Sequence, residues 1–149
     1  MSKLYHLAYI SKNSFVGTLG EQEKNLRSIL EFAQRNNALL GVTGALLYSG
    51  GYYCQVIEGD RDVLENLFET IQMDRRHNEI TVLHFEQIEL RSFSEWAMAM
   101  AGYEDAMRFD IEGIRASKDE ILMRDSGRDM VIVLEQMVKQ HQAILKTAG

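Results

Sequence analysis

Apolar and polar residues follow one another along this chain with the periods of strands and helices. Residues 3–10 carry no charge after Lys3, which is typical of a strand buried on both faces. Apolar side chains at i, i+3, i+4 and i+7 then predict a helix over residues 20–36, behind a capping box from Thr18 to Glu21. The chain therefore begins with a strand and an amphipathic helix.

The pattern continues with a predicted hairpin and a second helix. Apolar, β-rich runs at 41–48 and 52–58 flank Ser49-Gly50-Gly51, a typical hairpin turn. The helical spacing returns from near Asp60 and ends at residues 74–77. Two further strands are predicted at 80–89 and 93–100, and an amphipathic helix at about 128–146.

This order of elements predicts an α+β fold. It is the ferredoxin-like β-α-β-β-α-β pattern with an added fifth strand. Two helices are expected on one sheet face and a C-terminal helical extension on the other, since the first strand is apolar on both sides. We expect residues 1–103 to form the main domain and 104–149 the extension, packed on the sheet in the same structural unit.

Composition narrows the classes of function. The 149 residues include 46% hydrophobic and 26% charged residues, which is ordinary for a globular domain. The net charge of −6 argues against direct nucleic-acid binding, and no apolar run is long enough to predict a membrane span. One cysteine excludes an internal disulfide, so a reducing cytoplasm is the expected location.

Residues that could catalyse a reaction are not grouped in any known motif. The histidines His6, His77, His84 and His141 form no i+3 or i+4 pair with another ligand, so no metal site is expected. Cys54 lies in a predicted strand with no neighbouring base, and the glycines form no phosphate-binding loop. An enzyme is therefore not expected.

Polar residues inside apolar segments are the informative feature. Tyr9 lies in the first strand, and Gln55 lies among bulky residues of a strand that should be central. A buried, unpaired amide costs about 1–3 kcal/mol, so Gln55 needs a partner, and a purely structural bond to Tyr9 would suffice. Asn36 and Asn37 have an equally simple interpretation as a helix C-cap.

Five segments together resemble the BLUF (blue light using flavin) family over about residues 4–100. The segments are LAYISK around Tyr9, ILEFAQRNNALLGVTGALLY at 29–48, YYCQVIEG around Gln55, MDRRH at 73–77 and FSEWAMAM from Phe93. Each is weakly specific alone, and their order and spacing carry the resemblance.

The resemblance implies a blue-light photoreceptor that binds FAD, with FMN or riboflavin as alternatives. Tyr9 and Gln55 would be the photoactive pair: Tyr9 gives an electron and a proton, and Gln55 rearranges by rotation, tautomerisation or both. The implied flavin-binding residues are Ile29, Asn36, Asn37, Ile71, Asp74, Arg76 and His77. Trp96 and Met98 match a pair with a signalling role, although ordinary core packing explains them equally well.

Two departures from the family pattern change the expected site. Ala33 stands where many members have a small hydroxyl residue, which removes one partner for the glutamine. Tyr53 and Cys54 replace a commoner pair of apolar residues, and strand alternation places Tyr53 on the face of Gln55. Tyr53 is therefore a candidate second electron donor, or else a core aromatic with a bonded hydroxyl.

The resemblance also implies that the signal passes to a separate downstream protein, or through a change in a homo-oligomer. Two other classes stay open from the residues alone. The first is an acylphosphatase-type enzyme, although its anion-binding loop would need an arginine that KNSFVGTLG lacks. The second is a ferredoxin-like interaction module without flavin.

Overall fold

The computed structural model describes residues 3–14, 17–75, 77–104, 110–117 and 119–148, without the side chains of residues 19, 77, 104 and 141–148. Five strands and four helices occur in these ranges. Their order is β1 (Leu4–Asn13), α1 (Leu19–Leu40), β2 (Thr43–Ser49), β3 (Tyr52–Asp60), α2 (Arg61–Gln72), β4 (His77–Gln87), β5 (Ala99–Glu104), α3 (Ile111–Ser117) and α4 (Glu120–Ala148).

The strands form a single sheet in the order β4-β1-β3-β2-β5. β1 pairs antiparallel with β3 and β4, and β2 pairs antiparallel with β3. β5 is the added strand, and it pairs parallel with β2 at the sheet edge. The predicted ferredoxin-like α+β fold with a fifth strand is confirmed.

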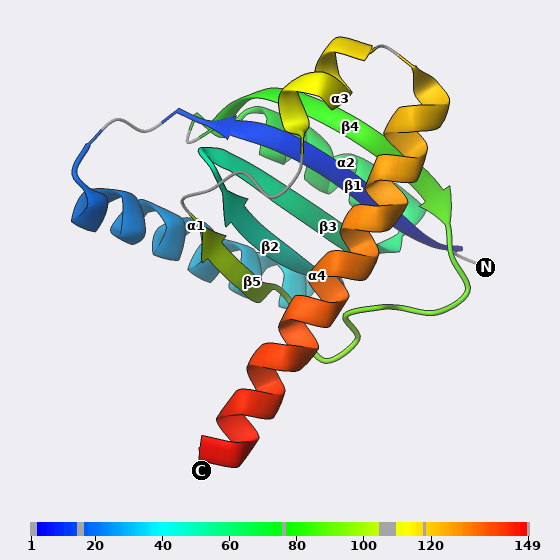
Figure 1. Ribbon diagram of the computed structural model, residues 1–149. Helices are drawn as coiled ribbons and strands as arrows, with labels where there is room; N and C mark the ends of the chain where they lie inside the picture. The colour runs from blue at the N-terminus through cyan, green and yellow to red at the C-terminus, as the bar shows by residue number, and fades with distance from the viewer. Residues whose placement is uncertain (1–2, 15–16, 76, 105–109, 118, 149) are drawn as a thin grey trace.

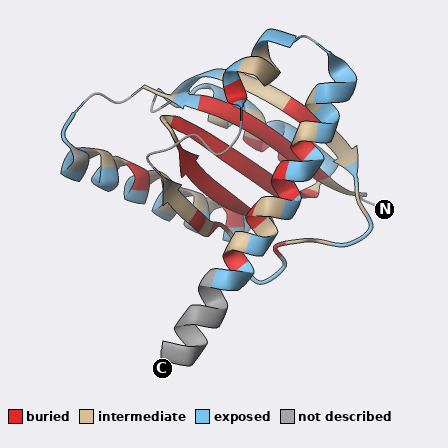
Figure 2. Ribbon diagram, in the orientation of Figure 1, coloured by how far each residue is buried: buried red, intermediate tan, exposed pale blue. Residues whose placement is uncertain are grey.

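Helices cover both faces of this sheet. α1 and α2 lie behind it in Figure 1, and α4 crosses in front of it with α3 above. The strands are the most buried part of the molecule, and α4 turns its buried residues toward them (Figure 2). The predicted placement of two helices on one face and the C-terminal extension on the other is also confirmed.

Alternation along the central strands divides the core into two clusters. Tyr9 and Ile57 belong to the cluster on the α1–α2 side, whereas Ile10 and Val56 belong to the cluster under α4. Successive strand residues point to opposite faces, so one strand contributes to both layers. This explains why the residues of the first strand are apolar on both faces of the sheet.

Local signals set most helix and turn boundaries. The side chain of Thr18 accepts a hydrogen bond from Glu21 N at 3.2 Å, which confirms the predicted cap of α1. The turn after β2 uses Gly50 and Gly51 at φ 56° and 90°, values that favour glycine. α1 ends at Gly41, whose φ of 69° is left-handed.

The C-cap interpretation of Asn36 and Asn37 is therefore wrong. Both asparagines lie inside α1, which extends to Leu40. Their side chains are thus free for contacts outside the helix.

The segment before β5 also differs from the prediction of a strand at 93–100. The chain turns through residues 89–98, and the strand begins only at Ala99. The buried carboxylate of Glu58 accepts hydrogen bonds from Ser92 N at 2.6 Å and Phe93 N at 3.0 Å. These bonds to a side chain replace the ladder bonds that a strand would make, which keeps this segment out of the sheet.

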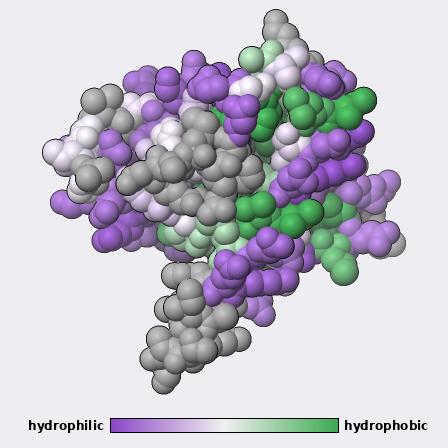
Figure 3. Space-filling view, viewed as in Figure 1, coloured by the Kyte–Doolittle hydropathy of each residue, from purple (hydrophilic) through white to green (hydrophobic). Residues whose placement is uncertain are grey.

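The C-terminal helix is longer than the predicted range of 128–146. It starts at Glu120, and a short helix that the sequence did not predict, α3, precedes it. Met130, Leu134 and Val138 are buried against the sheet. Hydrophilic residues predominate along the outward side of α4 in Figure 3. The exposed large apolar side chains of this helix include Ile121, Leu122 and Ile132. No helix in the described ranges could cross a membrane.

Candidate functional site

Tyr9 and Gln55 meet on the sheet face below α1 and α2. They are direct partners in the register of β1 and β3. Tyr9 Oη donates a hydrogen bond to Gln55 Oε1, and both side chains are buried, with exposures of 0% and 8%. The sheet register thus brings together two polar groups that lie 46 positions apart in sequence.

The surroundings of Tyr9 keep its phenol neutral. Burial, followed by the negative charge of Asp74, raises the pKa of Tyr9 above its ordinary value of 10.0. The ring packs edge-on against Phe68 of α2, with 5.5 Å between centroids. Tyr9 therefore presents a protonated hydroxyl in a fixed direction, toward the Gln55 carbonyl.

A pocket opens directly above this pair, between the two helices and the sheet. Its free space is about 630 Å³, including the mouth. The residues that line it come from β1, α1, β2, β3, α2, the turn after α2 and the segment before β5: Tyr9, Ile29, Phe32, Ala33, Asn36, Asn37, Leu46, Tyr53, Gln55, Ile57, Leu67, Thr70, Ile71, Asp74 and Met98. Most are apolar, and a few polar groups converge, which is the usual composition of a small-molecule site.

The walls contain most of the residues selected from the sequence. Ile29 of α1 and Ile71 of α2 both line the pocket, as do Asn36, Asn37 and Asp74. Asn37 is 2% exposed, and its Nδ2 donates to Ala97 O at 2.9 Å. Five of the seven predicted flavin-binding residues thus lie around one cavity.

Two predicted residues cannot be placed at the pocket. Arg76 lies outside the described residues. His77 begins β4, and its side chain is likewise outside the description.

Several lining residues were missed in the sequence, although their helical spacing would have found them. Leu67 and Thr70 lie on the same face of α2 as Ile71, at i, i+3 and i+4, and Asp74 follows two residues after the end of the helix. Phe32 lies similarly between Ile29 and Asn36 on α1, next to Ala33, which the sequence had already indicated. Counting three and four positions from each predicted residue along α1 and α2 identifies the helix residues that face the pocket.

Tyr53 lines the same pocket, two residues before Gln55 on β3. Its exposure is 3%, and its hydroxyl donates to Asn13 Oδ1 at 3.2 Å. Its ring meets that of Tyr48 edge-on at 5.4 Å, and Tyr48 stacks on Tyr103 at 4.7 Å. Tyr53 therefore has both the position expected of a second donor and the bonded hydroxyl of a core residue.

Trp96 and Met98 lie on opposite sides of the sheet layer. Met98 is 2% exposed, lines the pocket, and places its sulfur 3.9 Å from Gln55 Nε2. Trp96 packs against the cluster under α4. The two would share a face in a strand, but the turns before Ala99 separate them.

The side chains that line the pocket fit a flat heteroaromatic ring that carries carbonyl and ring-nitrogen acceptors. Ile29 and Ile71 supply apolar surfaces from the two helices, and Tyr9 with Gln55 supplies a polar edge below. The Asn36 and Asn37 amides and the Thr70 hydroxyl provide the other polar groups. A flavin isoalloxazine ring has this shape and this distribution of polar atoms.

The fold and this pocket define a class of ferredoxin-like flavin photosensors. The profile of the BLUF family, described as sensors of blue-light using FAD, matches residues 4–99. The chain belongs to the BLUF family, and the resemblance inferred from the sequence is confirmed. This membership replaces the acylphosphatase alternative and agrees with the expectation of a sensor.

Similar proteins include free-standing sensors and parts of larger chains. The solved dark-state structure of BlrB, a BLUF protein, has a TM-score of 0.67 and 30% identity, and the match covers 93% of this chain and 96% of that one. The photoactivated adenylate cyclase subunit beta of Euglena longa is 36% identical over 69% of this chain and 12% of its own length. The blue light- and temperature-regulated antirepressor BluF of Escherichia coli is 29% identical over 54% of this chain and 20% of its own. This chain thus spans a small part of these two relatives.

Proposed function

We propose that this blue-light sensor switches through Tyr9 and Gln55 and passes the change to Met98, β5 and α4. The observation that carries the proposal is the buried hydrogen bond from Tyr9 to Gln55 at the floor of a pocket that fits a flavin. FAD is the cofactor of the family. The proposed binding residues are Ile29, Asn36, Asn37, Ile71 and Asp74, with Arg76 and His77 retained from the resemblance.

The bound flavin supplies absorption of blue light and an excited state that accepts an electron. Tyr9 supplies that electron, and its phenol proton leaves Oη along the hydrogen bond to Gln55 Oε1. Electron and proton then return to Tyr9, so no product forms. Gln55 is left rearranged, by rotation or tautomerisation, with its amide donor in a new direction.

Rotation of Gln55 changes what it presents to Met98. In the structure Oε1 accepts from Tyr9 and Nε2 lies 3.9 Å from the Met98 sulfur. Exchange of the two ends places the carbonyl oxygen against sulfur and the amide against the phenol. Met98 therefore loses a donor, and its contact with β3 weakens.

The backbone around Met98 connects the pocket to the last strand. Gln34 Nε2 of α1 donates to Met98 O at 3.1 Å, and Asn37 holds Ala97 O. β5 follows at Ala99 and has a single strand neighbour, β2. At Gly102, β5 lies so close to α4 that a Cβ would be 2.9 Å from Met137 Cε. This contact supports α4 as the next element of the pathway.

The energy of one rearranged hydrogen bond limits this pathway. Such a bond is worth about 0.5–1.5 kcal/mol net, whereas moving a population from 1:99 to 99:1 needs about 5.5 kcal/mol. Gln55 must therefore act on an element that is already nearly balanced, or draw on photon energy. β5, with a single neighbouring strand, is the element that we propose.

The substitution Tyr9→Phe tests the switch. We expect the purified variant to bind flavin and remain yellow but to lose the light-induced red shift, because the phenol proton is absent. Tyr52→Phe is the matched control, since Tyr52 points to the opposite face and bonds Glu112. A normal red shift in Tyr9→Phe would contradict the proposal, and a wild-type chain that stays colourless with added flavin would indicate a flavin-free module.

Hydrogen exchange tests the pathway. Peptides covering Ala99–Glu104 and α4 should exchange differently in light and darkness, whereas β1 should not. If the peptides of Ala99–Glu104 and of α4 were protected equally in light and in darkness, the proposed route would be contradicted.

We further propose that residues 1–103 form the sensor and 104–149 an extension through which a separate protein, or a second copy in a homo-oligomer, receives the signal. The cyclase and antirepressor names of the relatives support a partner of this kind. Affinity capture and light scattering, each in darkness and in light, test the two arrangements. A location in the cytoplasm stays a prediction.

A further inference from the structure

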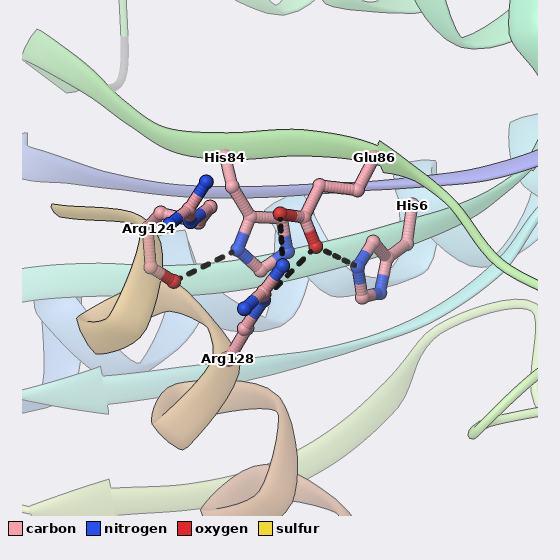
Figure 4. A network of polar contacts seen from close by, with 5 residues as sticks. All are labelled: His6, His84, Glu86, Arg124 and Arg128. Carbon is pink, nitrogen blue, oxygen red and sulfur yellow. Dashed lines mark hydrogen bonds and ion pairs between the residues drawn. The ribbon is translucent and has the colours of Figure 1, made fainter. Parts of the chain in front are cut away.

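A second polar cluster lies on the opposite side of the sheet from the pocket. His6 of β1 is the register partner of Glu86 of β4, and His84 precedes Glu86 by two residues on the same face. Figure 4 shows the two imidazole rings and the carboxylate directed toward one another beside α4. The ring centroids of His6 and His84 are 4.4 Å apart.

The two imidazoles are buried without adequate hydrogen bonds. His6 is 7% exposed and His84 is 6% exposed. Within the described part of the chain, His6 Nδ1, His6 Nε2 and His84 Nε2 have no partner at hydrogen-bond distance. His6 Nε2 lies 3.8 Å from Glu86 Oε2, which is the dashed contact between these residues in Figure 4. An unsatisfied buried polar group destabilises the folded chain, so a ligand that binds these nitrogens would be favoured. The flavin pocket uses none of them.

The Nδ1 atom of His84 is oriented toward a backbone carbonyl, as is common for the non-coordinating nitrogen of metal-bound histidines. His84 Nδ1 lies 3.4 Å from the backbone oxygen of Arg124. A proton on Nδ1 directed at that carbonyl leaves the lone pair on Nε2, the buried atom that faces the cluster. Histidines that bind metals commonly donate their other N–H to a carbonyl in this way.

The three side chains also lie at suitable distances. One ligand atom from each residue lies within 4.8 Å of the other two. Zinc binds imidazole nitrogen at about 2.0–2.1 Å, which puts tetrahedral ligands about 3.3 Å apart. Binding therefore requires the three side chains to approach one another.

We propose that His6, His84 and Glu86 bind one divalent transition-metal cation of the zinc type. Two imidazoles and a carboxylate are typical ligands of zinc, and three protein ligands leave a fourth position for water.

Arg128 of α4 competes with the cation for Glu86. Its Nη2 lies 2.8 Å from Glu86 Oε1 and its Nε 3.2 Å from Oε2. The Arg128 side chain is 52% exposed, so it can turn into solvent when a cation takes the carboxylate. Binding therefore exchanges a contact between α4 and the sheet for a metal ligand.

Because Arg124 and Arg128 both belong to α4, metal occupancy changes how this helix is attached to β4. The site gives the cell a second input to α4, on the face opposite to the light input. Its existence does not depend on the proposed roles of Tyr9 and Gln55.

Zinc titration of the untagged, chelator-treated full chain tests the site. Calorimetry should give one Zn²⁺ per chain, and Co²⁺ should give visible bands at wavelengths beyond the flavin absorption. His84→Gln should weaken Zn²⁺ binding at least about tenfold, and Glu86→Gln should also weaken it. Arg128→Gln should strengthen binding severalfold, because it removes the competitor.

His141→Gln is the matched histidine control and should bind as the wild type does. Circular dichroism of each variant separates unfolding from ligand loss, and Glu86→Gln keeps the test valid if His84→Gln fails to fold. Binding that is equally tight in wild type, His84→Gln and Glu86→Gln would show an adventitious ion only and overturn the site. Absence of stoichiometric Zn²⁺ binding to the wild type would also overturn it, whatever the outcome for the light-induced red shift.

Discussion

The two faces of the sheet are built from the same strands but packed differently. On the α1–α2 face, the strand residues Tyr9, Tyr53 and Gln55 line a pocket. On the α4 face, their neighbours Ile10 and Cys54 belong to a cluster that includes Met130 and Leu134 of α4. One face is hollow and polar at its floor, and the other is filled.

This difference shows how a sheet can separate detection from stability. Adjacent residues such as Cys54 and Gln55 face different layers, so a change in Gln55 need not disturb the packing under α4. We propose that the connection between the faces instead runs at the sheet edge, where Met98 lines the pocket and Gly102 of β5 lies close to Met137 of α4. Substitutions on either face should therefore have separable effects.

Leu134→Ala should have the largest effect on stability. Leu134 is fully buried under α4, and truncation of such a residue costs about 2–5 kcal/mol. The red shift on illumination should persist in the folded fraction, because the pocket face is intact. Urea unfolding and light-minus-dark spectra of the same preparation check both statements, and loss of the shift in folded protein would break the separation.

Gly127→Ala should have a smaller effect on the same face. A Cβ at Gly127 would lie 2.5 Å from His84 Nδ1 and 2.9 Å from Leu83 Cβ, so α4 must move away from the sheet. Overpacking costs about 1–3 kcal/mol, offset by up to about 1 kcal/mol from the better helix propensity of alanine. Thermal unfolding measures the net loss.

Gly20→Ala is the control for that substitution. Gly20 is also helical, and no atom lies within 4 Å of an added Cβ. A loss of stability as large as that of Gly127→Ala would refute the close-approach explanation.

Acid should destabilise the protein through His6 on the α4 face. The folded-state pKa of His6 is about 4, below the ordinary 6.5, so the unfolded chain binds the proton more readily. The stability that this depressed pKa supplies is present above pH 6.5 and is lost as pH falls toward 4. In the presence of a chelator, the free energy of unfolding should decline less over this window in His6→Gln than in the wild type, and parallel declines would contradict the assignment.

Tyr53→Phe should have the smallest effect. Its hydroxyl donates a hydrogen bond to Asn13 Oδ1 at 3.2 Å. Loss of such a bond costs about 0.5–1.5 kcal/mol of stability, and none of the red shift should be lost. If Tyr53 is the proposed second donor, Tyr53→Phe should lengthen the flavin fluorescence lifetime in a Tyr9→Phe background. An unchanged lifetime would leave Tyr53 a core residue.

Much of the fold followed from periodicity because most elements combine a clear apolar stripe with a terminal signal. Thr18 caps α1, and Gly50-Gly51 forms the hairpin turn, as expected. The error at 93–98 has a nonlocal cause, since the Glu58 carboxylate that binds this segment lies on another strand. α3 has only seven residues, too few to show a helical period.

The two sites differed in how far the sequence predicted them. The pocket residues lie at helical spacings and in recognisable segments, so most were found. The group of His6, His84 and Glu86 was missed because only helical spacings between ligands were considered. His84 and Glu86 lie two residues apart on β4, and His6 lies opposite Glu86 on β1. The three side chains are close together only because of the register of β1 with β4.

The Glu58 carboxylate has a consequence for engineering this protein. It holds Ser92 and Phe93 through their backbone N–H groups, so the contact does not depend on the side chain at Ser92. Exposed positions such as Ser94 and Glu95 should therefore accept grafted sequences, for example an epitope or a reactive handle for a dye. Proline is the exception at 92 and 93, because it has no N–H to offer.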